Sequence, residues 1–174
     1  MNSHSEDLYL EAEQAIKDSN FIEAKRIYEE ILEEDPRSAC THNSMGWLYK
    51  TQFDNYDKAE RHYQAAIRYE PSYPHSYWNL AYLYNDLERW DELRALMKQC
   101  LSVPTVDKSL IYNRIALMEE QMEHFEKASQ CYRKASLLCV SDERLEEFGK
   151  AIKRCEYKME LLNASDGSGL NELI

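Results

Sequence analysis

Apolar and polar positions along the chain follow one pattern that occurs four times. In the third copy, Tyr77, Leu80, Ala81 and Tyr84 recur at i, i+3, i+4 and i+7, which is the spacing of one face of a helix. A polar stretch without this periodicity, such as residues 85–92, then separates the first apolar face from a second one. Each copy is therefore predicted to be a pair of amphipathic helices joined by a short turn.

Two ladders of equivalent residues define the period. The first holds four aromatic residues spaced by 35, 34 and 35 positions, namely Phe21, Tyr56, Trp90 and Phe125. The second holds four small residues spaced by 34, 35 and 35 positions, namely Ala12, Gly46, Ala81 and Ala116. Because the ladders disagree by one residue inside the second copy, we expect an additional residue in its turn, most simply at Asn55.

The ladders divide the chain into repeats and flanking segments. Residues 1–162 are predicted to form a single domain, and residues 163–174 are predicted to form a flexible tail. Alternatively, the apolar end of this tail, residues 170–174, folds back onto the scaffold. The repeats are expected at about residues 5–38, 39–73, 74–108 and 109–141.

A capping helix is predicted to follow the fourth copy, over residues 142–162. Ser141 or Asp142 is expected at its N-cap, because short polar side chains accept hydrogen bonds from the free N–H groups of a first turn. Its polar outer face satisfies the requirement that a terminal repeat be covered. We expect this helix to lie over the apolar flank of the fourth copy, including Leu137 and Leu138.

The residues at fixed places in the copies resemble the tetratricopeptide repeat, which has a period of 34 residues. In the third copy the matching residues are Tyr77, Leu80, Ala81, Tyr84, Trp90 and Met97. In the second copy they are His42, Met45, Gly46, Tyr49, Ala59, Tyr63 and Pro71. This resemblance covers about residues 5–140. It implies an all-α fold, a right-handed helical-hairpin solenoid of four repeats plus the C-terminal capping helix.

The net charge of −11 limits the classes of partner. Nucleic-acid binding requires a stripe of Lys and Arg, so a nucleic acid is not expected. Residues 1–38 hold eleven acidic and four basic side chains, which serve solubility or, alternatively, attract a basic partner.

No constellation for chemistry is present in the sequence. The five histidines form no H-E-x-x-H motif, and there is no Gly-rich phosphate loop or nucleophile elbow. The five cysteines lack C-x-x-C spacing, which favours reduced thiols. We therefore expect neither catalytic residues, nor a metal, nor a cofactor. The lack of a long apolar stretch or secretory signal predicts a cytoplasmic protein without a membrane partner.

The resemblance implies that the first helices of the hairpins line a concave, partner-binding surface. Glu13 lies at one of the positions that line this surface in the family. Trp47, Trp78 and Tyr82 are expected to act as rigid anchors, although the tryptophans could instead fill gaps between repeats. The predicted partner-binding residues are Tyr9, Asn43, Trp47, Lys50, His75, Trp78, Tyr82, Asn85, Asn113, Arg114 and Leu117.

Some members of this family bind the C-terminal carboxylate of a partner through a set of Lys, Asn and Arg side chains called a carboxylate clamp. Of the five positions that the clamp requires, only Asn79 and Arg114 agree, so such a clamp is not expected. The sequence instead predicts a non-enzymatic scaffold or adaptor that binds a peptide segment or helix of another protein. The alternatives are a self-assembling homo-oligomeric repeat protein and a small chaperone of secreted proteins.

Overall fold

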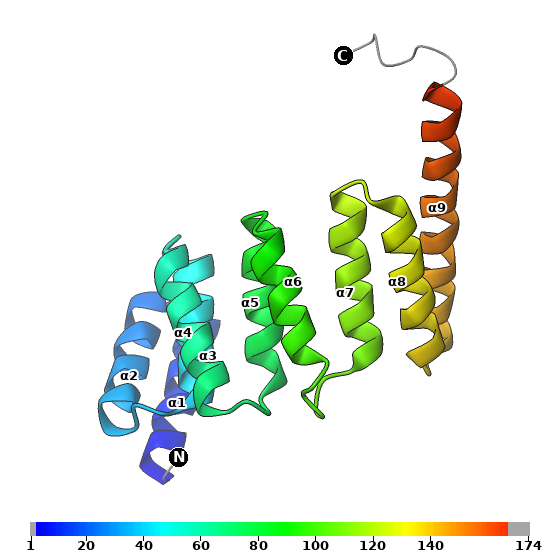
Figure 1. The fold of residues 1–174 in the computed structure, drawn as a ribbon. Coiled ribbons are helices and arrows are strands. Elements are labelled where there is room, and N and C mark those ends of the chain that lie inside the picture. Colours follow the sequence, from blue (N-terminus) through cyan, green and yellow to red (C-terminus); the bar gives the residue numbers. More distant parts are fainter. Residues whose placement is uncertain (1–2, 167–174) are drawn as a thin grey trace. The chain divides into compact units, whose positions relative to one another are not determined.

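The computed structural model describes residues 3–166, which form nine α-helices and no strands (Figure 1). The helices are α1 (Ser3–Lys17), α2 (Phe21–Glu34), α3 (Ala39–Thr51), α4 (Tyr56–Tyr69), α5 (Pro74–Asp86), α6 (Trp90–Cys100), α7 (Lys108–Gln121), α8 (Phe125–Leu138) and α9 (Asp142–Asp166). The predicted all-α fold of helical hairpins is confirmed. None of the helices in this range combines the length and the apolarity needed to cross a bilayer. The chain separates into two compact units, Met1–Leu93 (unit 1) and Arg94–Ile174 (unit 2).

All four hairpin turns are closed in the same way. In each turn one residue other than glycine has a positive φ angle, and the next residue's N–H donates to a carbonyl near the end of the preceding helix. The residues with positive φ are Ser19, Asp54, Glu88 and Glu123. In three turns the closing bond reaches back five residues, as in Arg89 N to Tyr84 O at 2.8 Å. This is the 6→1 bond of the Schellman motif, which satisfies a carbonyl at the end of a helix.

The turn between α3 and α4 holds the additional residue that the ladders require. Four residues, 52–55, separate these helices, whereas three residues separate the helices of each other hairpin. The closing bond here runs from Asn55 N to Tyr49 O at 2.8 Å and so spans six residues. Asn55 also caps α4, because its Oδ1 accepts from Lys58 N at 3.0 Å. The prediction of the insertion at this turn is confirmed.

The core of unit 1 contains small residues packed against buried tyrosines. Within this unit α1 packs on α2 and α3 on α4, while α2 contacts α3 and α5 contacts both α3 and α4. Ala12, Ala24 and Tyr28 are fully buried in the first hairpin. In the second hairpin Gly46 lies directly against the ring of Tyr63. The first helices thereby come close enough to form one surface.

Unit 2 contains the hairpin of α7 and α8, with α9 packed along α8 (Figure 1). The buried residues that these helices share are Ala116, Ala128, Tyr132, Ala135, Phe148, Ala151 and Cys155. The predicted cap is present, since Ser141 Oγ accepts from Arg144 N at 3.4 Å. The helix continues to Asp166, beyond the predicted end at 162, and the rest of the predicted tail lies outside the described residues.

The expectation that α9 covers Leu137 and Leu138 is wrong. Leu137 is 86% exposed and Leu138 is 47% exposed. The helix face that α9 covers instead carries Tyr132 and Ala135. Because α9 packs on the face that continues the core, the last turn of α8 keeps its leucines at the surface.

Glu120 connects helices α7, α8 and α9 of unit 2. Its carboxylate accepts from Tyr132 Oη of α8 at 2.9 Å and from Arg154 Nε and Nη2 of α9 at 2.7 and 2.8 Å. Lys158 Nζ donates to the same carboxylate at 3.0 Å. These donors hold the pKa of Glu120 down to about 2, with the Arg154 hydrogen bonds as the largest cause. Glu120 is thus a structural residue that fixes α9.

Candidate functional site

A hollow of about 260 Å³ opens on the first helices of unit 1. Its lining comes from α1, α3 and α5 and consists of Tyr9, Glu13, Ile16, Asn43, Ser44, Trp47 and Asn79. On α1 the three residues are spaced i, i+4 and i+7, so one helix face presents them together. The predicted partner-binding residues Tyr9, Asn43 and Trp47 thus lie around a single hollow.

Hydrogen bonds fix the polar side chains of this hollow across neighbouring helices. The hydroxyls of Tyr9 and Ser44 are 2.8 Å apart and join α1 to α3. Asn79 Nδ2 of α5 donates to Asn43 Oδ1 of α3 at 2.9 Å. An asparagine amide offers two donors and an acceptor, so this one bond leaves hydrogen-bonding capacity for a peptide backbone.

Glu13 supplies the one charged side chain in the lining of this hollow. It is half-buried, and Tyr28 Oη donates a hydrogen bond to its Oε1. The rings of Tyr9 and Tyr28 lie 5.6 Å apart, so the carboxylate borders an aromatic wall. Burial raises the pKa of both tyrosines, which keeps their hydroxyls protonated as donors at neutral pH.

The other predicted residues of unit 1 lie outside the lining of the hollow. Lys50 Nζ forms an ion pair with Asp86 Oδ2 at 2.6 Å, so its charge is already compensated by α5. The exposed ring of His75 lies 5.3 Å from that of Tyr73. Tyr82 is 47% exposed, whereas Trp78 and Asn85 are half-buried.

The three predicted residues of α7 belong to unit 2. Asn113 and Arg114 are half-buried there. Leu117 packs against the core that α7 shares with α8 and α9, so part of its surface serves stability. Their role in binding stays a prediction.

Ser44, Asn79 and Ile16 were not among the predicted residues. Ser44 and Asn79 occupy the same repeat position as Arg114, two residues before the small ladder residue. That equivalence was the available signal, because a position that faces a groove in one copy faces it in the others. Ile16 carried no comparable signal, since its counterparts Lys50 and Asn85 are polar.

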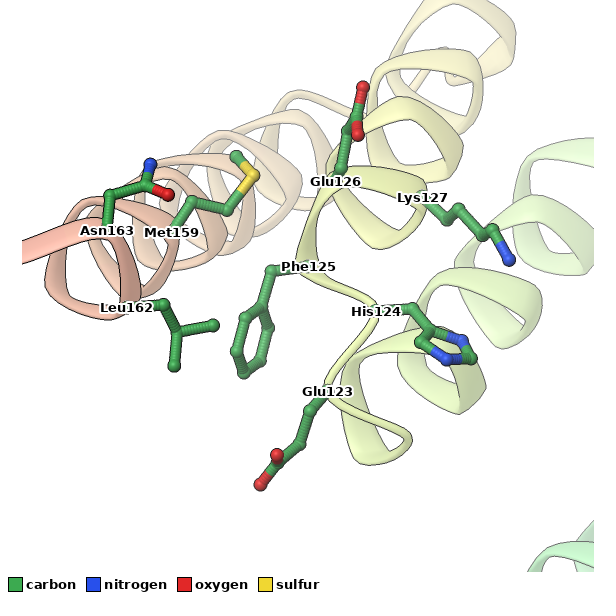
Figure 2. A pocket seen from close by; sticks show the side chains of 8 residues that line it. All are labelled: Glu123, His124, Phe125, Glu126, Lys127, Met159, Leu162 and Asn163. Atoms are coloured by element: carbon green, nitrogen blue, oxygen red, sulfur yellow. The ribbon is translucent and has the colours of Figure 1, made fainter. Parts of the chain in front are cut away.

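A second hollow, of about 430 Å³, lies in unit 2 between the α7–α8 turn and the last turns of α9. Figure 2 shows Phe125 and Leu162 facing each other across it, with Met159 and Asn163 on the same helix as Leu162. Lys158 Nζ lies 4.9 Å from the centre of the Phe125 ring. None of the predicted partner-binding residues lines this hollow.

Two histidines form a separate titratable pair within the α3–α4 hairpin. His42 Nδ1 and His62 Nδ1 are 3.0 Å apart, and His42 Nε2 lies 3.1 Å from the carbonyl oxygen of Pro36. Because a carbonyl oxygen only accepts, neutral His42 carries its proton on Nε2. His42 Nδ1 is therefore an acceptor, and His62 Nδ1 donates to it. Burial is the main cause that lowers the pKa of His62 to about 4, and it lowers the pKa of His42 as well.

Metal-binding geometry is not found in the part of the chain that the structure describes. Within residues 3–166, no three His, Cys, Asp or Glu side chains gather closely enough to hold an ion. The polar groups of the residues that line the unit 1 hollow are amides, hydroxyls, one indole N–H and one carboxylate. This set is suited to hydrogen bonding with a peptide.

Comparison with known proteins agrees with this architecture. The crystal structure of MamA protein aligns with a TM-score of 0.65 and 16% identity, over 92% of this chain and 94% of that one. PilF of Pseudomonas aeruginosa gives 0.71 and 16%, over 90% and 69%. A thermophilic TPR protein of Thermus thermophilus gives 0.63 and 19%, over 85% and 81%. Identities at this level show a shared fold.

No curated protein sequence matches the chain significantly. A family model does match residues 110–139, and its description is tetratricopeptide repeat. These residues span most of α7 and α8, the fourth of the copies defined by the ladders. The fourth hairpin thus matches the tetratricopeptide repeat, and the resemblance of the chain to the tetratricopeptide repeat family is confirmed.

Proposed function

We propose that this chain is a non-enzymatic scaffold that holds a peptide segment or helix of another protein against the first helices of its hairpins. The observation that carries the proposal is the hollow of unit 1, where Trp47, Asn43 and Tyr9 lie together. An aromatic anchor beside amides and hydroxyls supplies apolar contact together with hydrogen bonds to a backbone. Repeat proteins of this kind use extended concave surfaces for binding.

Affinity capture from the native host with three baits tests this function. The parent protein and Tyr157→Ala, which alters an exposed residue of α9 in unit 2, should retain the same partner. Trp47→Ala should lose it. Titration of that partner should show a loss of about 2 kcal/mol or more for Trp47→Ala if this residue is a hot spot. Such a loss is roughly thirtyfold in affinity.

Thermal melting of the same variants separates binding from folding. If Trp47→Ala binds the partner like the parent but melts at a much lower temperature, Trp47 only fills space between repeats and the proposed surface is wrong. A further variant, Asn43→Ala, removes the amide that accepts from Asn79. It should weaken binding by less than the tryptophan change, because a neutral hydrogen bond contributes about 1 kcal/mol.

Self-assembly is a second candidate function, and the end of α8 favours it. Leu137 is 86% exposed and Val140 is 95% exposed. The two residues are close in the sequence, at and just after the end of α8. A contiguous exposed apolar surface is a feature of interaction sites. Sedimentation at low and high protein concentration tests this candidate, because an assembly through this surface should dissociate in Leu137→Glu and persist in Tyr157→Ala.

A further inference from the structure

Tyrosine hydroxyls donate hydrogen bonds to glutamate carboxylates in both units. In unit 1 Tyr28 donates to Glu13 and Tyr84 donates to Glu60, the latter at 2.8 Å. In unit 2 Tyr132 donates to Glu120 at 2.9 Å. The three carboxylates are all half-buried, so each loses part of its hydration and is stabilised by the hydroxyl that it gains.

Two of these three carboxylates also bind cationic side chains of the chain itself. Arg89 Nη1 lies 2.6 Å from Glu60 Oε2. Arg154 Nε and Lys158 Nζ lie 2.7 and 3.0 Å from Glu120 Oε1. Each cation compensates the charge that burial would otherwise leave unpaired, which makes the pair stable inside the fold.

Glu13 differs from these two in having no cationic partner among the residues that the structure describes. Its carboxylate accepts a hydrogen bond from the neutral hydroxyl of Tyr28. Lys50, the lysine among the predicted partner-binding residues, is already paired with Asp86 at 2.6 Å. Lys17, four residues after Glu13 on α1, is exposed and forms no ion pair with it. The carboxylate instead borders the hollow, beside Trp47, whose ring face can also attract a cation.

The charge of unit 1 acts in the same direction. Residues 1–93 hold 19 acidic and 9 basic side chains, so this unit carries −10 of the formal net charge of −11. Such a field concentrates cationic ligands near the surface and speeds their association. This field does not determine where on unit 1 the cation binds. Glu13 in the hollow provides the specific site.

We propose that the partner segment places a lysine or arginine side chain in the unit 1 hollow, where its cation completes the Tyr28–Glu13 pair. This inference rests on the function proposed above and adds the chemical class of the ligand. The cation binds the free side of the Glu13 carboxylate, and the side-chain stem packs on Trp47. Asn43 and Asn79 bind the adjacent backbone.

Selection from a display library of short random peptides against the intact protein provides the first measurement. Peptides that bind the parent and fail to bind Trp47→Ala define ligands of the hollow. We expect these peptides to carry Lys or Arg at one fixed position. Selection against Glu13→Gln, in which the amide oxygen can still accept from Tyr28, should lose that enrichment.

A charge-swap cycle on one selected arginine peptide then isolates the contact. Citrulline keeps the shape of arginine and removes its charge. For the parent, the arginine form should bind about tenfold more tightly than the citrulline form. For Glu13→Gln the two forms should bind equally. Glu11→Gln is the matched control, since it removes the same charge from an exposed position on α1 and should keep the parent's ratio.

Three outcomes overturn the inference. If the hollow's peptides lack Lys and Arg, the ligand class is wrong while the proposed binding function stands. If Glu11→Gln lowers the ratio as much as Glu13→Gln does, only the diffuse field of unit 1 attracts the cation. If the parent selects no peptide that depends on Trp47, the proposed function fails and this inference fails with it.

Discussion

The ring of Tyr63 occupies the space that a side chain at Gly46 would require. A Cβ atom at that position would lie 2.6 Å from Cδ1 and Cε1 of the ring, well inside van der Waals contact. The equivalent residues of the ladder, Ala12, Ala81 and Ala116, carry such an atom. The second hairpin is therefore specialised for a close approach of α3 and α4.

Gly46→Ala should lower the free energy of unfolding by about 1–3 kcal/mol, because the methyl group overpacks the hairpin. Gly149→Ala is the matched control, since a Cβ there meets nothing within 4 Å. It should raise stability by about 0.5–1 kcal/mol through the better helix propensity of alanine. Urea denaturation measures both. Equal midpoints for Gly46→Ala and the parent would contradict the close approach.

Acidification should destabilise the α3–α4 hairpin through its histidine pair. The pKa of His62 is lowered from 6.5 in the unfolded chain to about 4, so the unfolded state binds protons that the folded state excludes. The stabilisation is complete above pH 6.5 and is lost as the pH falls toward 4. Since both rings remain partly exposed, we expect a loss of about 1–2 kcal/mol.

Denaturation across pH 4–7 measures this loss. His62→Gln should be less stable than the parent at pH 7 and should depend less on pH. His75→Gln changes an exposed ring and should keep the parent's profile. Identical slopes for His62→Gln and the parent would show that the pair does not titrate in this range. Glu29 and Lys58, which also act on the pKa of His62, are unchanged in all variants.

Removal of the Glu120 carboxylate should loosen α9. Glu120→Ala leaves the donors Tyr132, Arg154 and Lys158 without their common acceptor. We expect a loss of about 2–3 kcal/mol and faster hydrogen exchange along α9. Glu146→Ala breaks an ion pair with Lys150 in which both side chains are 71% exposed, and should change stability by less than about 0.5 kcal/mol. Comparable losses in both variants would remove the special role of Glu120.

Glu88→Gly should stabilise the turn between α5 and α6. Glu88 has a φ of 53°, a left-handed conformation that costs a residue with a Cβ about 1–2 kcal/mol. Glycine removes this cost but loses more backbone entropy on folding, so we expect a net increase in stability of about 0.5–1 kcal/mol. Ala95→Gly, within α6, should lose about 1 kcal/mol. A melting temperature for Glu88→Gly below that of the parent would contradict the turn geometry.

The sequence predicted most of the fold because the repeat supplies several independent copies of each constraint. Members of the small-residue ladder such as Ala12, Ala81 and Ala116 are all fully buried, each at the equivalent place in its own hairpin. The same ladders located the insertion in the second turn. The aromatic ladder was less regular, since Tyr56 is 41% exposed.

The polar contacts of the hollow could not be predicted in the same way. The Asn43–Asn79 bond joins residues 36 positions apart on different helices, and its geometry depends on how the hairpins pack. The position of α9 was also beyond the sequence pattern, because both faces near the end of α8 are apolar. The pattern therefore placed Leu137 under the cap, whereas the packing chose Tyr132 and Ala135.

The four-residue turn between α3 and α4 has a consequence for protein engineering. Its closing bond from Asn55 to Tyr49 has the same length, 2.8 Å, as the bond of the shorter turns, although it encloses one residue more. Phe53 and Asp54, in the middle of this turn, are both exposed. An epitope or fluorophore-binding tag can accordingly be inserted between these two residues. The tag would lie outside the lining of the hollow on the first helices and could report ligand binding there.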